Sequence, residues 1–250
     1  MPPRGSQAVW DDAGLTDPHG QPDKAARVRA MFDAIAPTYR FVNRVLSVGR
    51  DAYWRREAVA MVRPSPADLV LDVACGTGDL AEALVRAGVR RAVGCDFSLG
   101  MLRRASSAAT ASAVWWCAAD ALAIPFASET FDIVACAFGL RNFQDPSRGL
   151  EEMRRVLRVG GRVAILEFSI PGGRFLGPCY AVYFHRVLPR LAAWISGDRT
   201  RAYHYLPKSV ASFGDSAALS RALADAGFSR VAARRLTGGI VTVFVGWKDR

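Results

Sequence analysis

The chain has few cysteines, and their spacing fits neither a disulfide framework nor a zinc site. Five cysteines occur among 250 residues, without a C-x-x-C pair, so neither disulfides nor bound metal are expected. Most of them fall in predicted buried strands, where thiols act as small apolar fillers. This cysteine usage is typical of a cytosolic protein.

The chain also lacks a long apolar run. An apolar segment at residues 170–206 is interrupted by His185, Arg186 and Pro189, whereas a membrane-spanning helix needs about 20 apolar residues in succession. Residues 1–23 lack the charged and apolar segments of a secretory signal. Because they are rich in Pro, Gly, Asp and Gln, they predict a loose, disordered tail.

Lysine is scarce, with three residues beside thirty arginines, and the net charge of +10 gathers in the C-terminal third. Residues 171–250 hold 12 basic and 4 acidic side chains. Such a surface suits nucleic acid, an anionic membrane, or no particular partner. The sequence has no zinc module, RNA motif or base-flipping motif. Nucleic acid is therefore not expected, and peripheral membrane contact through the basic C-terminal third stays open.

The most informative stretch is LVLDVACGTGDL, residues 69–80. A short aliphatic run ends in small residues and precedes a helical pattern, as in a buried strand that enters a tight turn. Gly76 and Thr77 lie in that turn, and Asp96 ends the next apolar run about 20 residues later. An acid at that point is placed to accept hydrogen bonds from both ribose hydroxyls. The pattern predicts a nucleoside-binding βαβ unit.

The turn does not suit a nucleotide phosphate. Its spacing is D-x-A-x-G-x-G rather than GxGxxG, and Asp79 places a carboxylate where a pyrophosphate would lie. No Lys-Ser/Thr pair follows the glycines, which excludes a phosphate P-loop. The pattern resembles motif I of class I methyltransferases, whose cofactor S-adenosylmethionine (SAM) carries no phosphate. The alternative is a plain strand-to-helix turn.

Strands and helices alternate regularly after residue 66. Strands are predicted near 67–73, 91–96, 114–118, 131–138, 162–168, 228–236 and 240–247, with helices near 79–87, 99–108, 146–157 and 217–226. This order predicts an α/β fold, a doubly wound, mostly parallel seven-stranded sheet of Rossmann-like type with a C-terminal antiparallel hairpin. Gly238-Gly239 forms the hairpin turn.

Two further segments flank or interrupt the expected methyltransferase domain, residues 67–250. Residues 24–66 predict an N-terminal helical cap that is broken around 47–51. The apolar insertion at 170–206 is a lid over a lipophilic pocket, an interfacial helix, or ordinary core packing.

The ends of the predicted strands carry the other candidates for cofactor binding. Asp120 and Ala121 follow the third strand, where an acid and a backbone N–H can hold the adenine ring; a surface turn is the alternative. Phe97, directly after Asp96, packs either on adenine or in the core.

The fourth strand runs into Arg141 and Asn142. Ligands of open α/β sheets bind beyond the carboxyl ends of the strands, which places both residues at the mouth of the site. A plainer interpretation is that Arg141 pairs with Asp145 and Asn142 supplies a turn.

A narrower resemblance follows from four segments. They are FGLRN at 138–142, RVLRVGGRVAILEFS at 155–169, YRFVN at 39–43 and YHYLPKSV at 203–210. Together they are similar to the ubiquinone/menaquinone C-methyltransferase family, from residue 32 to the C-terminus. The sequence departs from that family at five positions. Arg40 stands in place of Asp, Val42 in place of Met, Asp51 in place of His, Val159 in place of Pro, and Ala137 in place of a small hydroxyl residue.

The resemblance implies a SAM-dependent enzyme that methylates a ring carbon of a reduced polyprenyl quinone precursor, a demethylmenaquinol or the ubiquinol equivalent. Arg141 would stabilise the developing phenolate, and Asn142 would orient that oxygen or a water. Tyr39 and Asn43 would line the acceptor pocket. The general base stays open among His204, Tyr205, Glu167 and water.

Two other functions compete with this one. One is SAM-dependent methylation of a different lipophilic or phenolic acceptor; the other is a non-catalytic SAM-binding scaffold. The implied location is the cytoplasm, with peripheral contact at the inner face of the membrane. The oligomeric state stays open, with a homodimer as one alternative.

Overall fold

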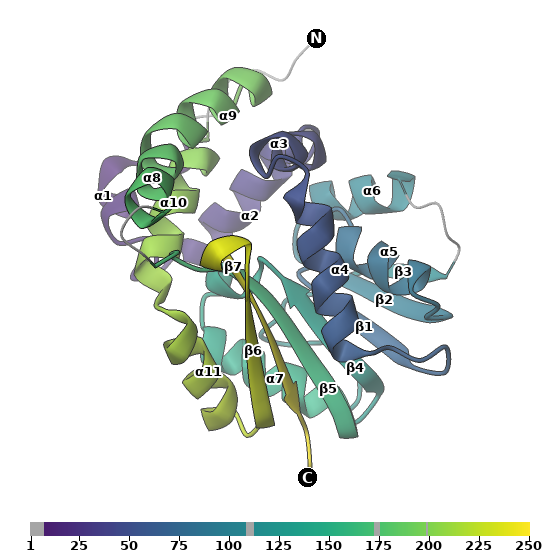
Figure 1. Cartoon of the computed structure of the whole chain (residues 1–250). Helices are drawn as coiled ribbons and strands as arrows, with labels where there is room; N and C mark the ends of the chain where they lie inside the picture. The colour runs from purple at the N-terminus through teal and green to yellow at the C-terminus, as the bar shows by residue number, and fades with distance from the viewer. Residues whose placement is uncertain (1–7, 109–112, 173–175, 199) are drawn as a thin grey trace.

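A computed structural model describes residues 8–108, 113–172, 176–198 and 200–250. At its centre lies a seven-stranded sheet (Figure 1) with strand order β3-β2-β1-β4-β5-β7-β6. The strands are β1 (Leu69–Val73), β2 (Arg91–Asp96), β3 (Val114–Ala118), β4 (Phe131–Ala137), β5 (Leu157–Phe168), β6 (Ser229–Leu236) and β7 (Val241–Trp247).

Strands β1 to β5 are parallel, and β7 runs antiparallel to both β5 and β6. The central strand β1 is apolar on both faces: Val70, Leu71 and Val73 are fully buried, as expected for a parallel strand covered on two sides. The predicted doubly wound sheet with its C-terminal antiparallel hairpin is confirmed.

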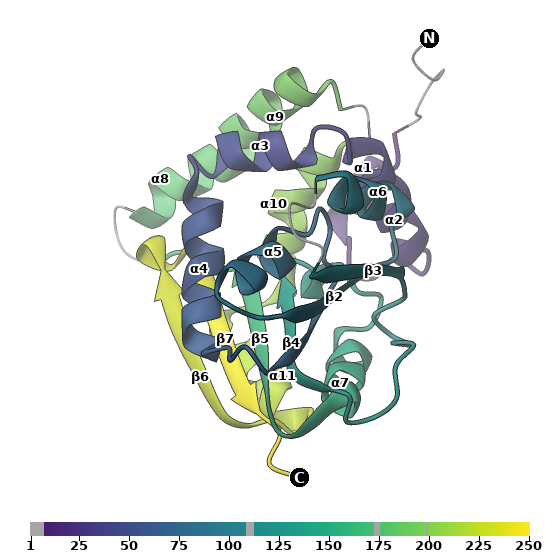
Figure 2. The ribbon, with the colours of Figure 1, turned by 90° about the vertical axis from the view of Figure 1, so that its right-hand side faces the viewer.

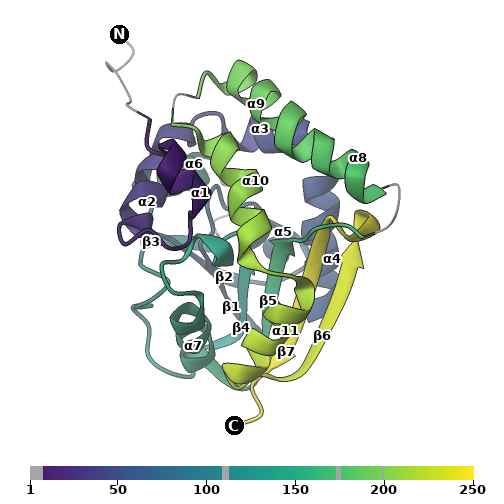
Figure 3. The same ribbon diagram turned by 90° about the vertical axis from the view of Figure 1, so that its left-hand side faces the viewer.

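Helices cover both faces of the sheet. One face packs against α4 (Arg50–Val62) and α5 (Asp79–Arg86), and the other against α7 (Pro146–Val156) and α11 (Ser216–Asp225), as the two side views show (Figures 2 and 3). The Asp145 carboxylate caps α7 by accepting from the Arg148 backbone N–H at 3.0 Å. With Pro146 at the first helical position, this cap explains why the helix predicted near 146–157 begins there.

A third layer of helices lies beyond the carboxyl ends of the parallel strands (Figure 3). It contains α2 (Lys24–Ile35), α3 (Tyr39–Leu46), α6 (Leu99–Ala108), α8 (Leu176–Val182), a π-helical turn (Tyr183–Val187), α9 (Leu188–Ser196) and α10 (Ala202–Phe213). These helices share their own apolar cluster, in which Met31, Phe184 and Tyr205 are buried. Among the described residues, no helix is both long enough and apolar enough to cross a membrane.

The predicted loose tail is wrong for the described part of residues 1–23. Residues 1–7 lie outside the described residues, but a short helix α1 (Asp12–Thr16) follows them. Trp10 is fully buried and stacks on Tyr205 at a centroid distance of 4.5 Å. The polar composition of the segment gave no sign of this contact. A single tryptophan that packs on a distant helix is enough to fix the position of the residues around it.

The single N-terminal cap predicted for residues 24–66 divides into two parts. Helices α2 and α3 lie in the third layer, whereas Trp54, Ala58 and Val62 place α4 against the sheet. These three apolar residues recur at the spacing of one helical face, which fits a helix packed on a sheet.

Strand β5 begins at Leu157, earlier than the predicted residue 162. Gly160 and Gly161 lie between the predicted helix and the predicted strand, and both hydrogen-bond to Lys248, Gly160 as donor at 2.7 Å and Gly161 as acceptor at 3.1 Å. The pairing of β4 with β5 shifts register here, so the glycines form an irregularity within the strand.

Candidate functional site

Two adjoining cavities lie between the carboxyl ends of the strands and the third layer of helices. The small cavity, about 70 Å³, is lined by Gly76, Asp96, Asp120 and their neighbours. The large cavity, about 340 Å³, contains Arg141. Phe32, Tyr39 and Phe138 line both of them. The cavities therefore meet at three aromatic rings.

The loop after β1 shapes the small cavity. Gly76 and Gly78 have φ angles of 55° and 81°, in the left-handed region that favours glycine. A Cβ atom at Gly78 would also collide with the Trp116 ring, whereas one at Gly76 would meet nothing within 4 Å. The backbone of Gly76 is thus open to a close ligand.

Asp96 joins this loop to the end of β2. One carboxylate oxygen, Oδ2, accepts from the Gly76 N–H at 2.8 Å, and Oδ1 accepts from the Ser98 N–H at 2.8 Å. Each oxygen keeps a lone pair for a second donor. Burial raises the pKa of Asp96 to about 6, against the opposing effect of these hydrogen bonds.

The raised pKa of Asp96, about 6, predicts a pH-dependent affinity for a ligand that donates hydrogen bonds to its carboxylate. Protonation removes acceptor capacity, so SAM should bind about tenfold more weakly at pH 5 than at pH 7. Calorimetric titrations across this range measure the effect. Asp96→Asn should bind weakly at both pH values; an equally steep dependence in that variant would contradict the assignment.

The other predicted adenine-side residues also reach the small cavity. Asp120, Ala121 and Phe97 line it. The Asp120 side chain accepts from the Leu122 N–H at 2.9 Å, so it forms the surface turn that was the alternative while still bordering the cavity. The guanidinium of Arg29 lies 5.2 Å from the Phe97 ring centroid.

Thr77 does not line the small cavity with Gly76. It lies in a third hollow, together with Arg55, Asp72 and Asp79, and its hydroxyl donates to Asp79 at 2.6 Å. The Oδ1 atom of Asp72 is buried without a hydrogen-bond partner among the described residues. Burial raises the pKa of Asp72 to about 8. An unpaired buried acceptor of this kind is costly unless a ligand supplies a donor.

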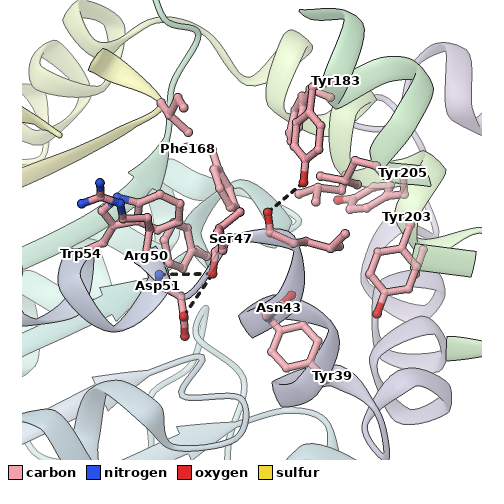
Figure 4. A pocket seen from close by; sticks show the side chains of 18 of the residues that line it. Tyr39, Asn43, Ser47, Arg50, Asp51, Trp54, Phe168, Tyr183, Tyr203 and Tyr205 are labelled. Atoms are coloured by element: carbon pink, nitrogen blue, oxygen red, sulfur yellow. Dashed lines mark hydrogen bonds between the residues drawn. The ribbon is translucent and has the colours of Figure 1, made fainter. Parts of the chain in front are cut away.

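The large cavity is lined mainly by apolar and aromatic side chains, and the predicted Tyr39 and Asn43 both line it (Figure 4). Both residues lie on α3, one helical turn apart, so they point to the same side. From the other side come Tyr183 and Tyr203 (Figure 4). Such a cavity suits a flat, largely apolar ligand.

Two buried arginines line the large cavity: Arg55, which pairs with Asp51 at 2.8 Å, and Arg141. The Nη1 of Arg141 donates to Glu167 Oε1 at 2.7 Å and to the Phe138 carbonyl at 2.6 Å, and its guanidinium lies 5.4 Å from the Phe168 ring centroid. Its Nε is buried without a partner among the described residues. The plainer expectation of a pair with Asp145 is wrong, since Glu167 at the end of β5 holds the guanidinium in place.

Asn142 faces the small cavity rather than the large one. Its Nδ2 donates to the Phe138 carbonyl at 3.2 Å, and its Oδ1 accepts from the Tyr205 hydroxyl at 3.0 Å. The short 3₁₀ turn Leu140–Asn142 separates the two side chains. Arg141 and Asn142 thus lie on different cavities, and the predicted orientation of the acceptor oxygen by Asn142 has no support in this geometry.

The three side chains considered as a general base lie in different surroundings. Tyr205 lines the large cavity, but its hydroxyl is engaged with Asn142, and burial raises its pKa to about 12. His204 lies in a different hollow, beside α1. Glu167 accepts from Arg141 and from the Phe168 N–H, the latter at 3.0 Å, and it is not among the residues that line the large cavity. None of the three side chains is placed to accept a proton from a ligand in the large cavity.

Sequence reasoning missed Tyr203 as a cavity residue. It was noted only within the YHYLPKSV segment, yet it lines the large cavity and is almost fully buried. Among the described residues its hydroxyl has no hydrogen-bond partner within 3.5 Å. The only signal was its place in a segment shared with a family, because periodicity does not separate a cavity-facing tyrosine from a core tyrosine.

Known proteins resemble this chain over most of its length. The sequence profile of the ubiE/COQ5 methyltransferase family matches residues 21–248. The demethylmenaquinone methyltransferase of Thermobifida fusca is 45% identical over 236 residues, which cover 91% of this chain and 98% of the relative. The ubiquinone/menaquinone biosynthesis C-methyltransferase UbiE of Geobacter sulfurreducens is 44% identical over 232 residues and covers 90% of each chain.

Solved structures share the fold. A methyltransferase of Haloferax volcanii, solved with the Trm112 methyltransferase activator, has a TM-score of 0.64 at 20% identity and covers 88% of this chain and 98% of its own. A SAM-dependent methyltransferase of Thermotoga maritima has a TM-score of 0.63 at 19% identity. Together with this fold, the family match and the curated relatives show that the chain is a class I SAM-dependent methyltransferase. Within that class, the chain belongs to the ubiE/COQ5 methyltransferase family.

Proposed function

We propose that the enzyme transfers a methyl group from SAM to a ring carbon of a reduced polyprenyl quinone precursor, converting a demethylmenaquinol to a menaquinol or acting on the ubiquinol equivalent. The observation that carries this proposal is the large aromatic cavity, which contains the buried guanidinium of Arg141 and meets the small cavity at Tyr39 and Phe138. The names of the relatives support it.

The residues of the small cavity fit SAM. Asp96 offers two oxygens to the ribose hydroxyls, and Asp120, Ala121 and Phe97 border the space for adenine. The third hollow adjoins the same loop, and the unpartnered Asp72 oxygen there suits the ammonium of the amino-acid end. When bound, SAM supplies an electrophilic methyl group, so the protein chiefly aligns the acceptor and excludes water.

The large cavity supplies what the acceptor needs. A quinol ring carbon becomes nucleophilic as a neighbouring hydroxyl loses its proton, and negative charge then develops on oxygen. Arg141, held by Glu167 at 2.7 Å, offers a fixed positive charge to that oxygen. The Tyr203 hydroxyl, buried without a partner among the described residues, provides a second donor. Water accepts the hydroxyl proton; the ring carbon then takes the methyl group, and S-adenosylhomocysteine is the leaving group. The methylated carbon finally loses its hydrogen as a proton while the oxygen regains one, which restores the aromatic quinol.

An acceptor panel tests the proposal against its competitors. Purified protein with SAM should methylate a demethylmenaquinol and leave simple phenols and phospholipid amines unmodified, as followed by mass spectrometry. Preferred methylation of another lipophilic phenol would reassign the acceptor. If SAM binds but none of these acceptors is methylated, a non-catalytic SAM-binding scaffold becomes the better account.

We also propose that the protein works in the cytoplasm, at the inner face of the membrane, with the basic C-terminal third in peripheral contact. The support is chemical: a polyprenyl quinol partitions into lipid, and residues 171–250 carry 12 basic against 4 acidic side chains. A homodimer is compatible with the same activity.

A further inference from the structure

Exposed apolar side chains gather on two helical segments of the third layer. Phe41, Val45 and Val48 follow one another at helical spacing along α3 and the turn after it, and Val182, Val187 and Trp194 extend from α8 to α9. Val48 is 85% exposed and Trp194 is 82% exposed. These six residues are called the α3–α9 face below. Single exposed apolar residues are ordinary, but a gathered set marks an interaction surface.

The two segments are neighbours in space. The Tyr183 hydroxyl donates to the Leu46 carbonyl at 2.8 Å, which joins the π-helical turn to the end of α3. Two views show α3 beside α9 at the end of the molecule away from the C-terminus (Figures 2 and 3). The apolar side chains of both segments therefore contribute to one region of the surface.

The α3–α9 face is continuous with the large cavity. Val48, which is largely exposed, also lines that cavity, together with Ser47, Arg50 and Tyr183. The cavity thus opens where the apolar side chains gather. Any partner that covers this face also covers the entrance for the acceptor.

The charge of these segments is of one sign. Residues 38–50 and 176–196 contain no aspartate or glutamate, whereas Arg50, Arg186 and Arg190 are exposed; Arg44 is exposed too, but it pairs with Asp51 at 3.4 Å. Arginines around an apolar surface suit anionic headgroups above an acyl layer. An ordinary protein partner would block the entrance, while a lipid layer covers it and holds the polyprenyl tail at the same time.

We propose that the α3–α9 face docks on an anionic phospholipid bilayer, with Trp194 and Phe41 at the headgroup boundary and the cavity entrance facing the lipid. The proposal rests on the proposed function, because it explains how a lipid-dissolved acceptor reaches the cavity. It also assigns the membrane contact to two defined helical segments, α3 with the turn after it and α8 to α9, instead of to the basic C-terminal third as a whole.

Sedimentation with vesicles tests this surface. Wild-type protein should bind phosphatidylcholine vesicles containing phosphatidylglycerol at least about tenfold more tightly than the double variant Phe41→Glu/Trp194→Glu. Trp115→Glu is the matched control, since Trp115 is 61% exposed but lies on β3, at the edge of the sheet. This control should bind vesicles within about twofold of wild type. Thermal melting confirms that each variant is folded.

Activity separates this proposal from the function on which it rests. With a short-tailed acceptor in solution, the double variant should match wild type; with a long-tailed acceptor in anionic vesicles, its turnover should fall about tenfold. Equal vesicle binding by wild type and the double variant would overturn the docking surface. The docking surface would also be overturned if wild-type protein were a dimer, and the double variant were a monomer that still bound vesicles as tightly as wild type. Vesicle binding without methylation of any acceptor would overturn the proposed function instead.

Discussion

Replacing Asp96 by alanine is expected to weaken SAM binding by about 100-fold. The carboxylate offers both oxygens to the ribose while each already holds one backbone N–H at 2.8 Å. Hydrogen bonds to a charged group contribute about 1.5–3 kcal/mol each, and two at the lower limit amount to about 3 kcal/mol, which is about 100-fold in affinity. Isothermal calorimetry measures the dissociation constant directly.

Asp120→Ala is the comparison for this experiment. Asp120 borders the same cavity but is exposed and engaged with the Leu122 N–H, so its loss should weaken SAM by less than about tenfold. The Asp96 variant also leaves two backbone donors without an acceptor, and its melting temperature should fall. Unchanged SAM affinity in a folded Asp96→Ala protein would show that the ribose contact is misassigned.

Replacing Arg141 by glutamine is expected to lower the methylation rate by about 100- to 1000-fold, the usual cost of removing a preorganised donor to a developing oxyanion. SAM affinity should stay within about twofold, since the residues that line the small cavity do not include Arg141. Single-turnover kinetics with saturating SAM measures the chemical step, and calorimetry measures the cofactor affinity.

The ion pair with Glu167 requires a second variant. Removing Arg141 alone leaves a buried carboxylate unpaired, which destabilises a protein by about 3–5 kcal/mol. The double variant Arg141→Gln/Glu167→Gln removes both charges, so it should regain stability without regaining activity. Wild-type turnover in the double variant would exclude Arg141 from the mechanism, whereas recovered stability with a lost rate supports its role.

The sequence predicted the sheet well because each part of it carries a local signal. Alternating apolar runs and helices set the parallel order, and the small-residue turn before Asp79 marked the edge of the sheet where the small cavity lies. Motif residues at strand ends meet because parallel strands end at the same edge. This is why Gly76, Asp96, Asp120 and Asn142 line one cavity.

The features that the sequence did not predict depend on contacts between distant segments. Nothing local indicates that Trp10 stacks on Tyr205, or that Glu167 rather than Asp145 pairs with Arg141. Likewise, consecutive residues such as Arg141 and Asn142 were predicted to share one site, but the 3₁₀ turn points them to different cavities. Side-chain direction in a short turn follows from backbone geometry that spacing does not encode.

The central claim is that the methyl group crosses from the small cavity to an acceptor ring carbon in the large one, past Tyr39 and Phe138. A single turnover with SAM carrying a ¹³C-labelled methyl group, followed by carbon NMR of the quinol product, tests it directly. The label should appear as a methyl group bonded to the aromatic ring. A methyl ether, or unreacted SAM with the acceptor bound, would contradict the claim.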